Sequence, residues 1–170
     1  MNWVLFTGTW RLTNKEVEAD VRQAVSQVIS RGDGVLTGGA TGVDFFAMDE
    51  ALKTNPTCSH LKIIIPSEIE NYINDVYTNW CHHPIKKEDI DLLAKILRQI
   101  KNINPDNFIE MPQENITQEE YDLRNIEEVK IAQEVFAFQV NNSSGTQHTI
   151  DQAKLLDVPI SVNKKYEIAE

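Results

Sequence analysis

Glycine and hydroxyl residues gather in three short segments of the sequence, each directly after an apolar run. The segments contain Gly8 and Thr9; Gly38, Gly39 and Gly42; and Ser144, Gly145 and Thr146. Glycine has no Cβ atom and lets a ligand approach the backbone, and free N–H groups at the start of a helix bind anions. Three such segments on one edge of a sheet would surround a phosphate group with backbone amides. These residues therefore predict a site for a nucleotide or another phosphorylated small molecule.

Each segment also has a simpler interpretation as a plain turn, and only their combination favours a ligand. No Gly-Lys-Ser/Thr sequence follows any of them, so none is a P-loop, and their spacing differs from the dinucleotide-binding fingerprint. A Gly39→Val variant is expected to lose the stabilisation that a ligand provides while it keeps its fold.

Four charged or amide side chains are further candidates for ligand contacts. Arg11 could clamp a phosphate with two parallel hydrogen bonds, although an arginine in a first loop is equally often a surface residue. Asp44 could accept a hydrogen bond from a ribose hydroxyl or cap the helix in which it lies. Arg124 and Asn125 fall in a predicted helix, where the spacing of Arg124 and Glu128 is typical of an exposed ion pair. From this spacing alone, Arg124 is not predicted to contact the ligand.

Strands and helices that alternate along the chain must position these residues. Short apolar runs predict strands, and apolar residues three and four positions apart predict the helices between them. The predicted strands are Trp3–Phe6, Gly34–Thr37, Leu61–Ile65, Val135–Phe138 and Pro159–Val162. The predicted helices span residues 14–32, 42–52, 68–80, 87–103, 117–132 and 146–156. Asn14 is a predicted N-cap, and Thr117 with Glu120 forms a predicted capping box.

This alternation predicts an α/β protein with a Rossmann-like, three-layer αβα fold and a mainly parallel sheet. Residues 1–170 would form a single nucleotide-binding domain, with residues 67–116 as a helical insertion or covering element that holds at most a short strand at Phe108 and Ile109. In open sheets of this kind, ligands bind outside the carboxyl ends of the strands, where the strand order reverses. The three glycine segments all follow strands on that edge.

The composition is that of a globular protein, with 41% hydrophobic and 25% charged residues. No apolar run is long enough to cross a membrane, and the N-terminal residues lack the basic region of a signal peptide, so a cytoplasmic protein is expected. The formal net charge of −10 repels nucleic acid and favours a small ligand that backbone amides can hold locally.

The two cysteines are too few for a disulfide framework. Cys81 is followed by His82 and His83, but no second pair stands at zinc-binding spacing. Neither a metal site nor a cofactor is expected.

Four strings of the sequence carry a family resemblance: TGTWR, LTGGATGVDFFAMDEAL, YDLRNIEEVKIAQEVFAF and SSGTQHTIDQAKLLDVPI. Within residues 1–66 and 117–162 they resemble the SLOG superfamily, which includes the Rossmann domain of DNA-processing protein A, the lonely-guy phosphoribohydrolases and nucleotide-sensing domains. The resemblance implies a Rossmann-like fold that binds nucleotides or their derivatives with these loops. The ligand-binding residues that it implies are Gly8, Thr9, Gly38, Gly39, Gly42, Asp44, Arg124, Asn125, Ser144, Gly145 and Thr146.

The chain departs from the lonely-guy pattern where that family has a glutamate that assists glycosidic cleavage. Thr149 stands at this position and cannot ionise near neutral pH. A hydrolase would therefore need a carboxylate from elsewhere, and the candidates are Asp44, Glu50 and Asp151.

A second departure is Trp10, which is inserted before Arg11 and could stack on a base or pack against the protein.

Three functions stay open at this stage. The favoured one is a nucleotide sensor or binding domain, the second is a nucleoside-monophosphate N-glycosidase, and the last is an accessory nucleic-acid protein. Pairing of two copies through helices also stays open.

Overall fold

The computed structural model describes all 170 residues and contains one six-stranded, fully parallel sheet. The strand order is β4-β3-β2-β1-β5-β6. The strands are β1 (Trp3–Gly8), β2 (Gly34–Thr37), β3 (Leu61–Ile65), β4 (Phe108–Glu110), β5 (Glu134–Val140) and β6 (Ile160–Tyr166). The chain runs outward from β1 to β4 and then returns to the other side of β1, so the strand order reverses between β1 and β5. The predicted parallel sheet is confirmed.

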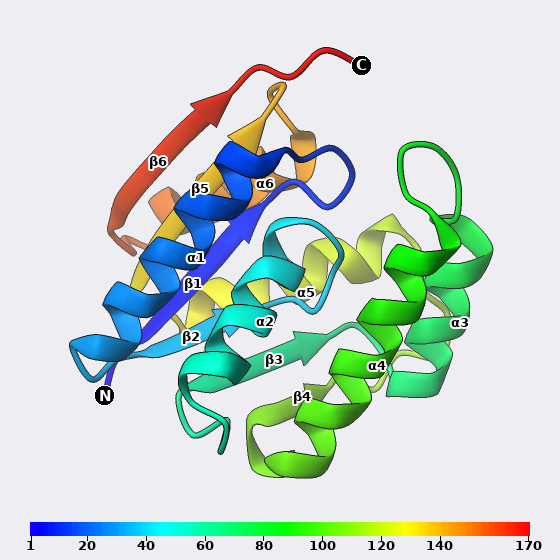
Figure 1. Cartoon of the computed structure of the whole chain (residues 1–170), viewed down its shortest axis with the longest axis horizontal. Helices are drawn as coiled ribbons and strands as arrows, with labels where there is room; N and C mark the ends of the chain where they lie inside the picture. Colours follow the sequence, from blue (N-terminus) through cyan, green and yellow to red (C-terminus); the bar gives the residue numbers. More distant parts are fainter.

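The chain has six α-helices, and five of them cover the two faces of this sheet. The six helices are α1 (Lys15–Ser30), α2 (Val43–Thr54), α3 (Ile69–Asn79), α4 (Lys87–Ile103), α5 (Gln118–Ile131) and α6 (Ser144–Leu155), with a short 3₁₀ turn at Pro105–Asn107. Helices α1, α2 and α4 lie on one face, and α5 and α6 lie on the other (Figure 1). The predicted three-layer αβα architecture is therefore confirmed. None of the helices combines the length and the apolar character that crossing a membrane requires.

Strand β1 shows why both faces need a helical layer. Val4 and Phe6 belong to the larger hydrophobic cluster, under α1 to α4, while Leu5 belongs to the smaller cluster, under α5 and α6. Successive side chains of a strand point to opposite faces, so an apolar run buries both faces only inside a sandwich of helices. The burial of such runs is the main favourable term in folding.

The predicted helix caps are present. The Asn14 side chain accepts a hydrogen bond from the Val17 amide at 3.0 Å. The Glu120 carboxylate accepts one from the Thr117 amide at 2.8 Å. These contacts satisfy amide groups that would otherwise lack a partner at the starts of α1 and α5.

The middle segment, residues 67–116, is built into the same layers. Its helix α4 buries the predicted stripe, which consists of Ile90, Leu93, Leu97 and Ile100. The short strand expected at Phe108 and Ile109 is β4, which pairs with β3 at the edge of the sheet. The segment therefore extends the sheet as well as covering it.

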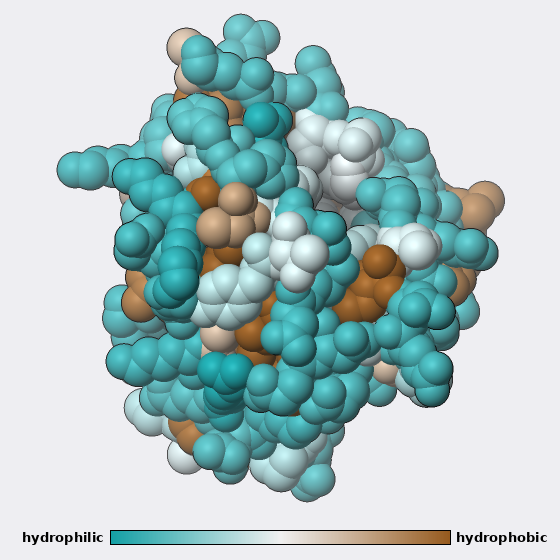
Figure 2. All heavy atoms as spheres, turned by 90° about the vertical axis from the view of Figure 1, so that its right-hand side faces the viewer, coloured by the Kyte–Doolittle hydropathy of each residue, from teal (hydrophilic) through white to brown (hydrophobic).

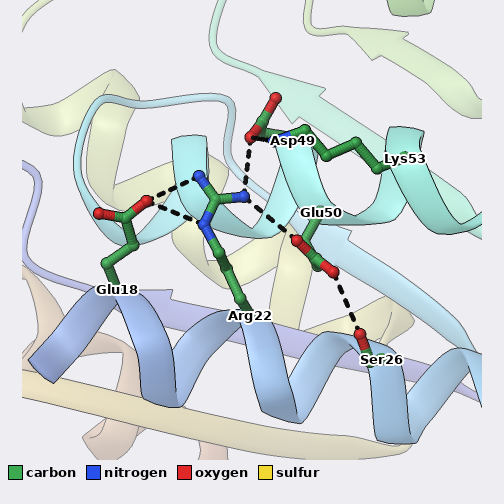
Figure 3. A network of polar contacts seen from close by, with 6 residues as sticks. All are labelled: Glu18, Arg22, Ser26, Asp49, Glu50 and Lys53. Carbon is green, nitrogen blue, oxygen red and sulfur yellow. Dashed lines mark hydrogen bonds and ion pairs between the residues drawn. The ribbon is translucent and has the colours of Figure 1, made fainter. Parts of the chain in front are cut away.

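A network of polar contacts joins α1 to α2 (Figure 3). The Arg22 guanidinium lies 2.7 Å from Asp49 Oδ2 and 3.3 Å from Glu50 Oε2. The Ser26 hydroxyl donates to Glu50 Oε1 at 3.2 Å. These contacts hold α2 against its neighbour and so help to fix the glycine-rich turn from which α2 starts.

Candidate functional site

A cavity of about 130 Å³ opens at the carboxyl ends of the strands, where their order reverses. Figure 2 views the molecule from the side toward which the strands point, where the hydrophilic surface is hollowed and apolar residues show between its ridges. Six of the sequence-predicted residues line the cavity: Gly8, Asp44, Arg124, Asn125, Gly145 and Thr146. They come from β1, α2, α5 and α6, so segments far apart in the sequence meet at one site.

The remaining predicted residues lie nearby but outside this cavity. They are Thr9, Arg11, Gly38, Gly39, Gly42 and Ser144. Thr9 organises its own loop, because its hydroxyl oxygen accepts hydrogen bonds from the amides of Arg11 at 3.3 Å and Leu12 at 3.4 Å. Arg11 lines an adjacent cavity of about 220 Å³ and pairs with Glu170 at 3.6 Å.

The second glycine loop, residues 38–42, needs its glycines for packing within the protein. A Cβ atom at Gly38 would overlap the Arg124 guanidinium. Gly39 has φ +70°, a conformation that strains other residues, and a Cβ there would lie 2.9 Å from Ile65 Cγ2. We therefore expect Gly39→Val to destabilise the fold as well, because valine would meet both backbone strain and a close contact with Ile65. Gly145 is different, since a Cβ there would have no atom within 4 Å.

The N-termini of α2 and α6 also differ, in whether their surroundings already occupy the backbone amides. At α2, the Val43 amide already donates to Thr9 O at 3.0 Å, and the Ala40 amide donates to Asp44 Oδ2 at 3.1 Å. At α6, the N-cap Ser143 makes no side-chain capping bond, and Gly145 opens into the cavity. The first amides of α6 and its partial positive charge are thus available to an anion.

Arg124 and Glu128 form a buried pair on the cavity wall. Arg124 is only 7% exposed and Glu128 only 3%, and Arg124 Nε lies 3.8 Å from Glu128 Oε1. The interpretation of this spacing as an exposed helix face is wrong, because α5 turns that face toward the end of β2. The guanidinium donates hydrogen bonds to Gly38 O and, at 3.0 Å, to Asn125 Oδ1. It thereby ties α5 to the second glycine loop.

Two carboxyl groups of the cavity are perturbed by burial. Burial raises the pKa of Glu128 to about 8, against the opposing effect of Arg124. Burial also raises the pKa of Asp44, again against Arg124. Removal from water disfavours the charged form of a carboxyl. Sequence reasoning missed Glu128 as a site residue, although its spacing from Arg124 places both on one face of α5.

Aromatic side chains form another wall of the cavity. The ring of Trp10 lies 4.6 Å from that of Trp80, and the ring of Trp80 lies 5.6 Å from that of Tyr121. The Tyr121 hydroxyl donates to Asp75 Oδ2 at 2.7 Å. Trp10 therefore packs against the protein and also lines the cavity. Trp80 carried no signal in the sequence, because only folding brings the middle segment to this edge.

The carboxylates considered for glycosidic cleavage have different positions. Glu50 belongs to the network between α1 and α2 (Figure 3), and Asp151 is exposed and accepts from the Gln147 side chain at 2.9 Å. Neither lines the cavity, whereas Asp44 does. Thr149 also lines it, with its hydroxyl donating to Gly145 O at 3.3 Å. No group of three or more His, Cys, Asp or Glu side chains is arranged to hold a metal ion.

No family model and no curated protein matches the chain. Solved structures do match it. DNA processing protein A from Helicobacter pylori superposes with a TM-score of 0.65 at 16% identity, covering 99% of this chain and 66% of that protein. DNA processing protein A from Streptococcus pneumoniae gives 0.59 at 17% identity, covering 99% and 50%. The structural-genomics target TM1055 gives 0.55 at 13% identity, covering 94% and 72%.

These likenesses place the chain in a fold class. The chain has a Rossmann-like fold that it shares with these solved structures, and this is the fold that the resemblance of the four sequence strings implied. It spans between half and two thirds of the length of the two DNA-processing proteins.

Proposed function

We propose that this protein binds a nucleotide or a nucleotide-derived phosphorylated small molecule in the cavity between β1 and β5, with the phosphate at the start of α6. The observation that carries this proposal is the uncapped start of α6, which opens at Gly145 into the cavity. Backbone amides and the helix dipole bind phosphate without a basic side chain. This mode of binding is compatible with a net charge of −10.

The aromatic wall supports a nucleotide rather than a bare phosphate. Trp10, Trp80 and Tyr121 line the same cavity as Gly145. Aromatic faces stack on nucleobases regardless of base identity. A ligand with an anionic end and a planar ring would use both parts of the site, so we assign the protein a binding or sensing role.

A panel of ligands tests this assignment through the unfolding temperature. The panel contains the four common nucleoside 5′-monophosphates, their nucleosides and ribose 5-phosphate. A ligand at a hundred times its Kd stabilises by about 2.7 kcal/mol, which raises the Tm of a domain of this size by about 5 °C or more. At least one monophosphate should do so, and its nucleoside should do much less. Equal Tm shifts from a nucleoside and its monophosphate would show that the phosphate does not contribute to binding, and this would contradict the proposed phosphate site.

Variants at Gly145 locate the phosphate. Gly145→Ala places a methyl group in open space, so the free energy of unfolding should stay equal or rise by up to about 1 kcal/mol. The same methyl group narrows the anion site, so binding of the monophosphate should weaken, and Gly145→Val should weaken it further. Asp151→Ala, on α6 but outside the cavity, serves as the control and should change neither property. Unaltered binding in both Gly145 variants would contradict the assigned position.

A second candidate function is hydrolysis of the N-glycosidic bond of a nucleoside monophosphate. The observation that favours it is the buried Asp44 carboxyl on the cavity wall, because such reactions use a carboxylate near the anomeric carbon. Chromatography of each nucleotide after incubation tests it directly. Release of free base by the wild type but not by Asp44→Asn would support hydrolysis. Binding without release of free base would support the binding or sensing role instead.

A further inference from the structure

One oxygen of the buried Glu128 carboxyl lacks a hydrogen-bond partner within the protein. This oxygen, Oε1, is also inaccessible to solvent. Three other buried side-chain atoms share this condition, namely Thr37 Oγ1, Gln139 Oε1 and His148 Nδ1. Of the four residues, only Glu128 lines the cavity. A buried oxygen without a partner costs free energy, but Oε1 faces Gly38 and is out of a ligand's reach. The other carboxyl oxygen, Oε2, is not sealed from solvent, so it is the atom of Glu128 that can meet a ligand in the cavity.

The neighbouring arginine does not supply the missing partner of Oε1. Arg124 Nη1 donates to Gly38 O and Arg124 Nε donates to Asn125 Oδ1. The nearest approach of Arg124 Nε to Glu128 Oε1 is 3.8 Å, which is too long for a hydrogen bond. Arg124 therefore supplies a positive charge nearby while its donors are directed to other atoms.

The charged and titratable groups around Glu128 come from three helices. Arg124 lies on α5, Asp44 lies on α2, and Tyr72 lies on α3. Burial raises the pKa of Glu128 to about 8, so its carboxyl holds a proton at pH 7. A second carboxylate beside Asp44 would also repel an anionic ligand. The uncharged form avoids this repulsion and offers one donor and one acceptor.

We propose that Glu128 binds the ligand as an uncharged carboxylic acid, through a hydrogen bond from Oε2 to a neutral acceptor such as a ring nitrogen of a nucleobase. This proposal rests on the proposed function, because the phosphate of the same ligand would lie at α6. It adds a preference for the ligand class: the group opposite the phosphate is neutral and presents a hydrogen-bond acceptor. Ligands that carry a second anionic group at that end are disfavoured by repulsion from Asp44.

Calorimetric titration between pH 7 and 9.5 tests the role of the proton. The probes are AMP and CMP, whose bases do not titrate in this range, and ribose 5-phosphate, which lacks a base. The affinity of the wild type for the tighter-binding nucleotide should be constant near pH 7 and fall about tenfold per pH unit above pH 8. Glu128→Gln, which keeps a donor and an acceptor, should bind the same nucleotide with no such fall.

Glu128→Leu removes both hydrogen-bonding functions at nearly constant volume. It should weaken nucleotide binding about tenfold or more and leave ribose 5-phosphate binding unchanged. Glu127→Gln is the matched control, since Glu127 is the next residue of α5 and its side chain is 43% exposed. The control should bind and respond to pH like the wild type.

The outcomes separate the two proposals. If ribose 5-phosphate and a nucleotide bind, but Glu128→Gln follows the same pH profile as the wild type or Glu128→Leu binds the nucleotide unchanged, the role of Glu128 is wrong and the phosphate site stands. If ribose 5-phosphate binds as tightly as both nucleotides, no base contact exists and the role of Glu128 is again wrong. If none of the three probes binds the wild type, both proposals are overturned.

Discussion

Glycine serves two different purposes at the strand ends of this protein. Gly38 and Gly39 are required because Arg124 and Ile65 occupy the space that a Cβ atom would need. Gly145 has open space beside it and lines the cavity. Identical residues in similar turns therefore have different significance for a ligand. The atoms around the position of the missing Cβ show whether a glycine is needed for packing or leaves the backbone open to a ligand.

Glu128 gives the stability of the protein a defined dependence on pH. Burial raises the pKa of its carboxyl from an ordinary value of 4.5 to about 8 in the folded protein. Between these values the unfolded chain is ionised and the folded protein holds the proton, so folding takes up a proton and becomes less favourable as the pH rises. This stabilising contribution is fully present below pH 4.5 and is lost as the pH rises to about 8.

Urea unfolding of the wild type and of Glu128→Gln at pH 5, 6, 7 and 8 measures this contribution. The free energy of unfolding of the wild type, relative to the variant, should fall by up to about 1.4 kcal/mol per pH unit over this range. The comparison with the variant removes the effect of all other titrating groups. Parallel profiles for the two proteins would show that Glu128 is ionised in the folded state.

At the scale of elements, two helices that start at the same edge of the sheet differ in what they can bind. The start of α2 is already occupied by the Thr9 carbonyl and by the contact between Ala40 and Asp44. The start of α6 has no side-chain cap and faces the cavity. The second glycine loop is thus part of the internal packing, and in the proposed function the phosphate lies at the loop before α6.

Gly39→Val should therefore destabilise the folded protein. The φ of +70° and the approach to Ile65 together cost about 3 kcal/mol, from backbone strain and from overpacking. Urea unfolding should show this loss, whereas Gly145→Ala should show none. A Gly39→Val protein as stable as the wild type would mean that the loop can rearrange, and the packing account of this glycine would fail.

At the scale of the whole molecule, the net charge argues against transferring DNA binding from a structural neighbour to this protein. The neighbour from Helicobacter pylori is described for its single-stranded DNA binding mode, while this chain carries a formal net charge of −10. A shared fold does not transfer a function. A phosphate backbone requires clustered lysine and arginine residues, whereas a single phosphate needs only a few backbone amides.

We therefore expect no saturable binding of single-stranded DNA. Fluorescence anisotropy with a labelled oligonucleotide at 50 mM salt should give a Kd weaker than about 100 µM. The Helicobacter pylori protein serves as the positive control in the same assay. Tight binding that weakens steeply with added salt would contradict this expectation and favour a nucleic-acid role.

The alternation of elements could be predicted from the sequence because it depends on short-range patterns. Apolar runs and helical spacing indicated the layers, and Asn14 and Thr117 marked where two helices begin. The glycine segments indicated the edge at which a site could form. These signals are local, since each depends on residues within one strand, one helix or one turn.

The membership of the candidate site was decided by the tertiary structure. The rotation of α5 against the sheet turns Arg124 and Glu128 inward, although their spacing fits an exposed pair equally well. The packing of the middle segment brings Trp80 against Trp10, a neighbour that no local pattern specifies. The sequence by itself determined which elements form, because hydrogen bonding and side-chain periodicity act over a few residues. Strands β5 and β6 end at Val140 and Tyr166, beyond the predicted Phe138 and Val162, because pairing between the two strands extends them. Only folding decided which side chains meet, because that depends on how whole elements rotate and pack to bury their apolar faces.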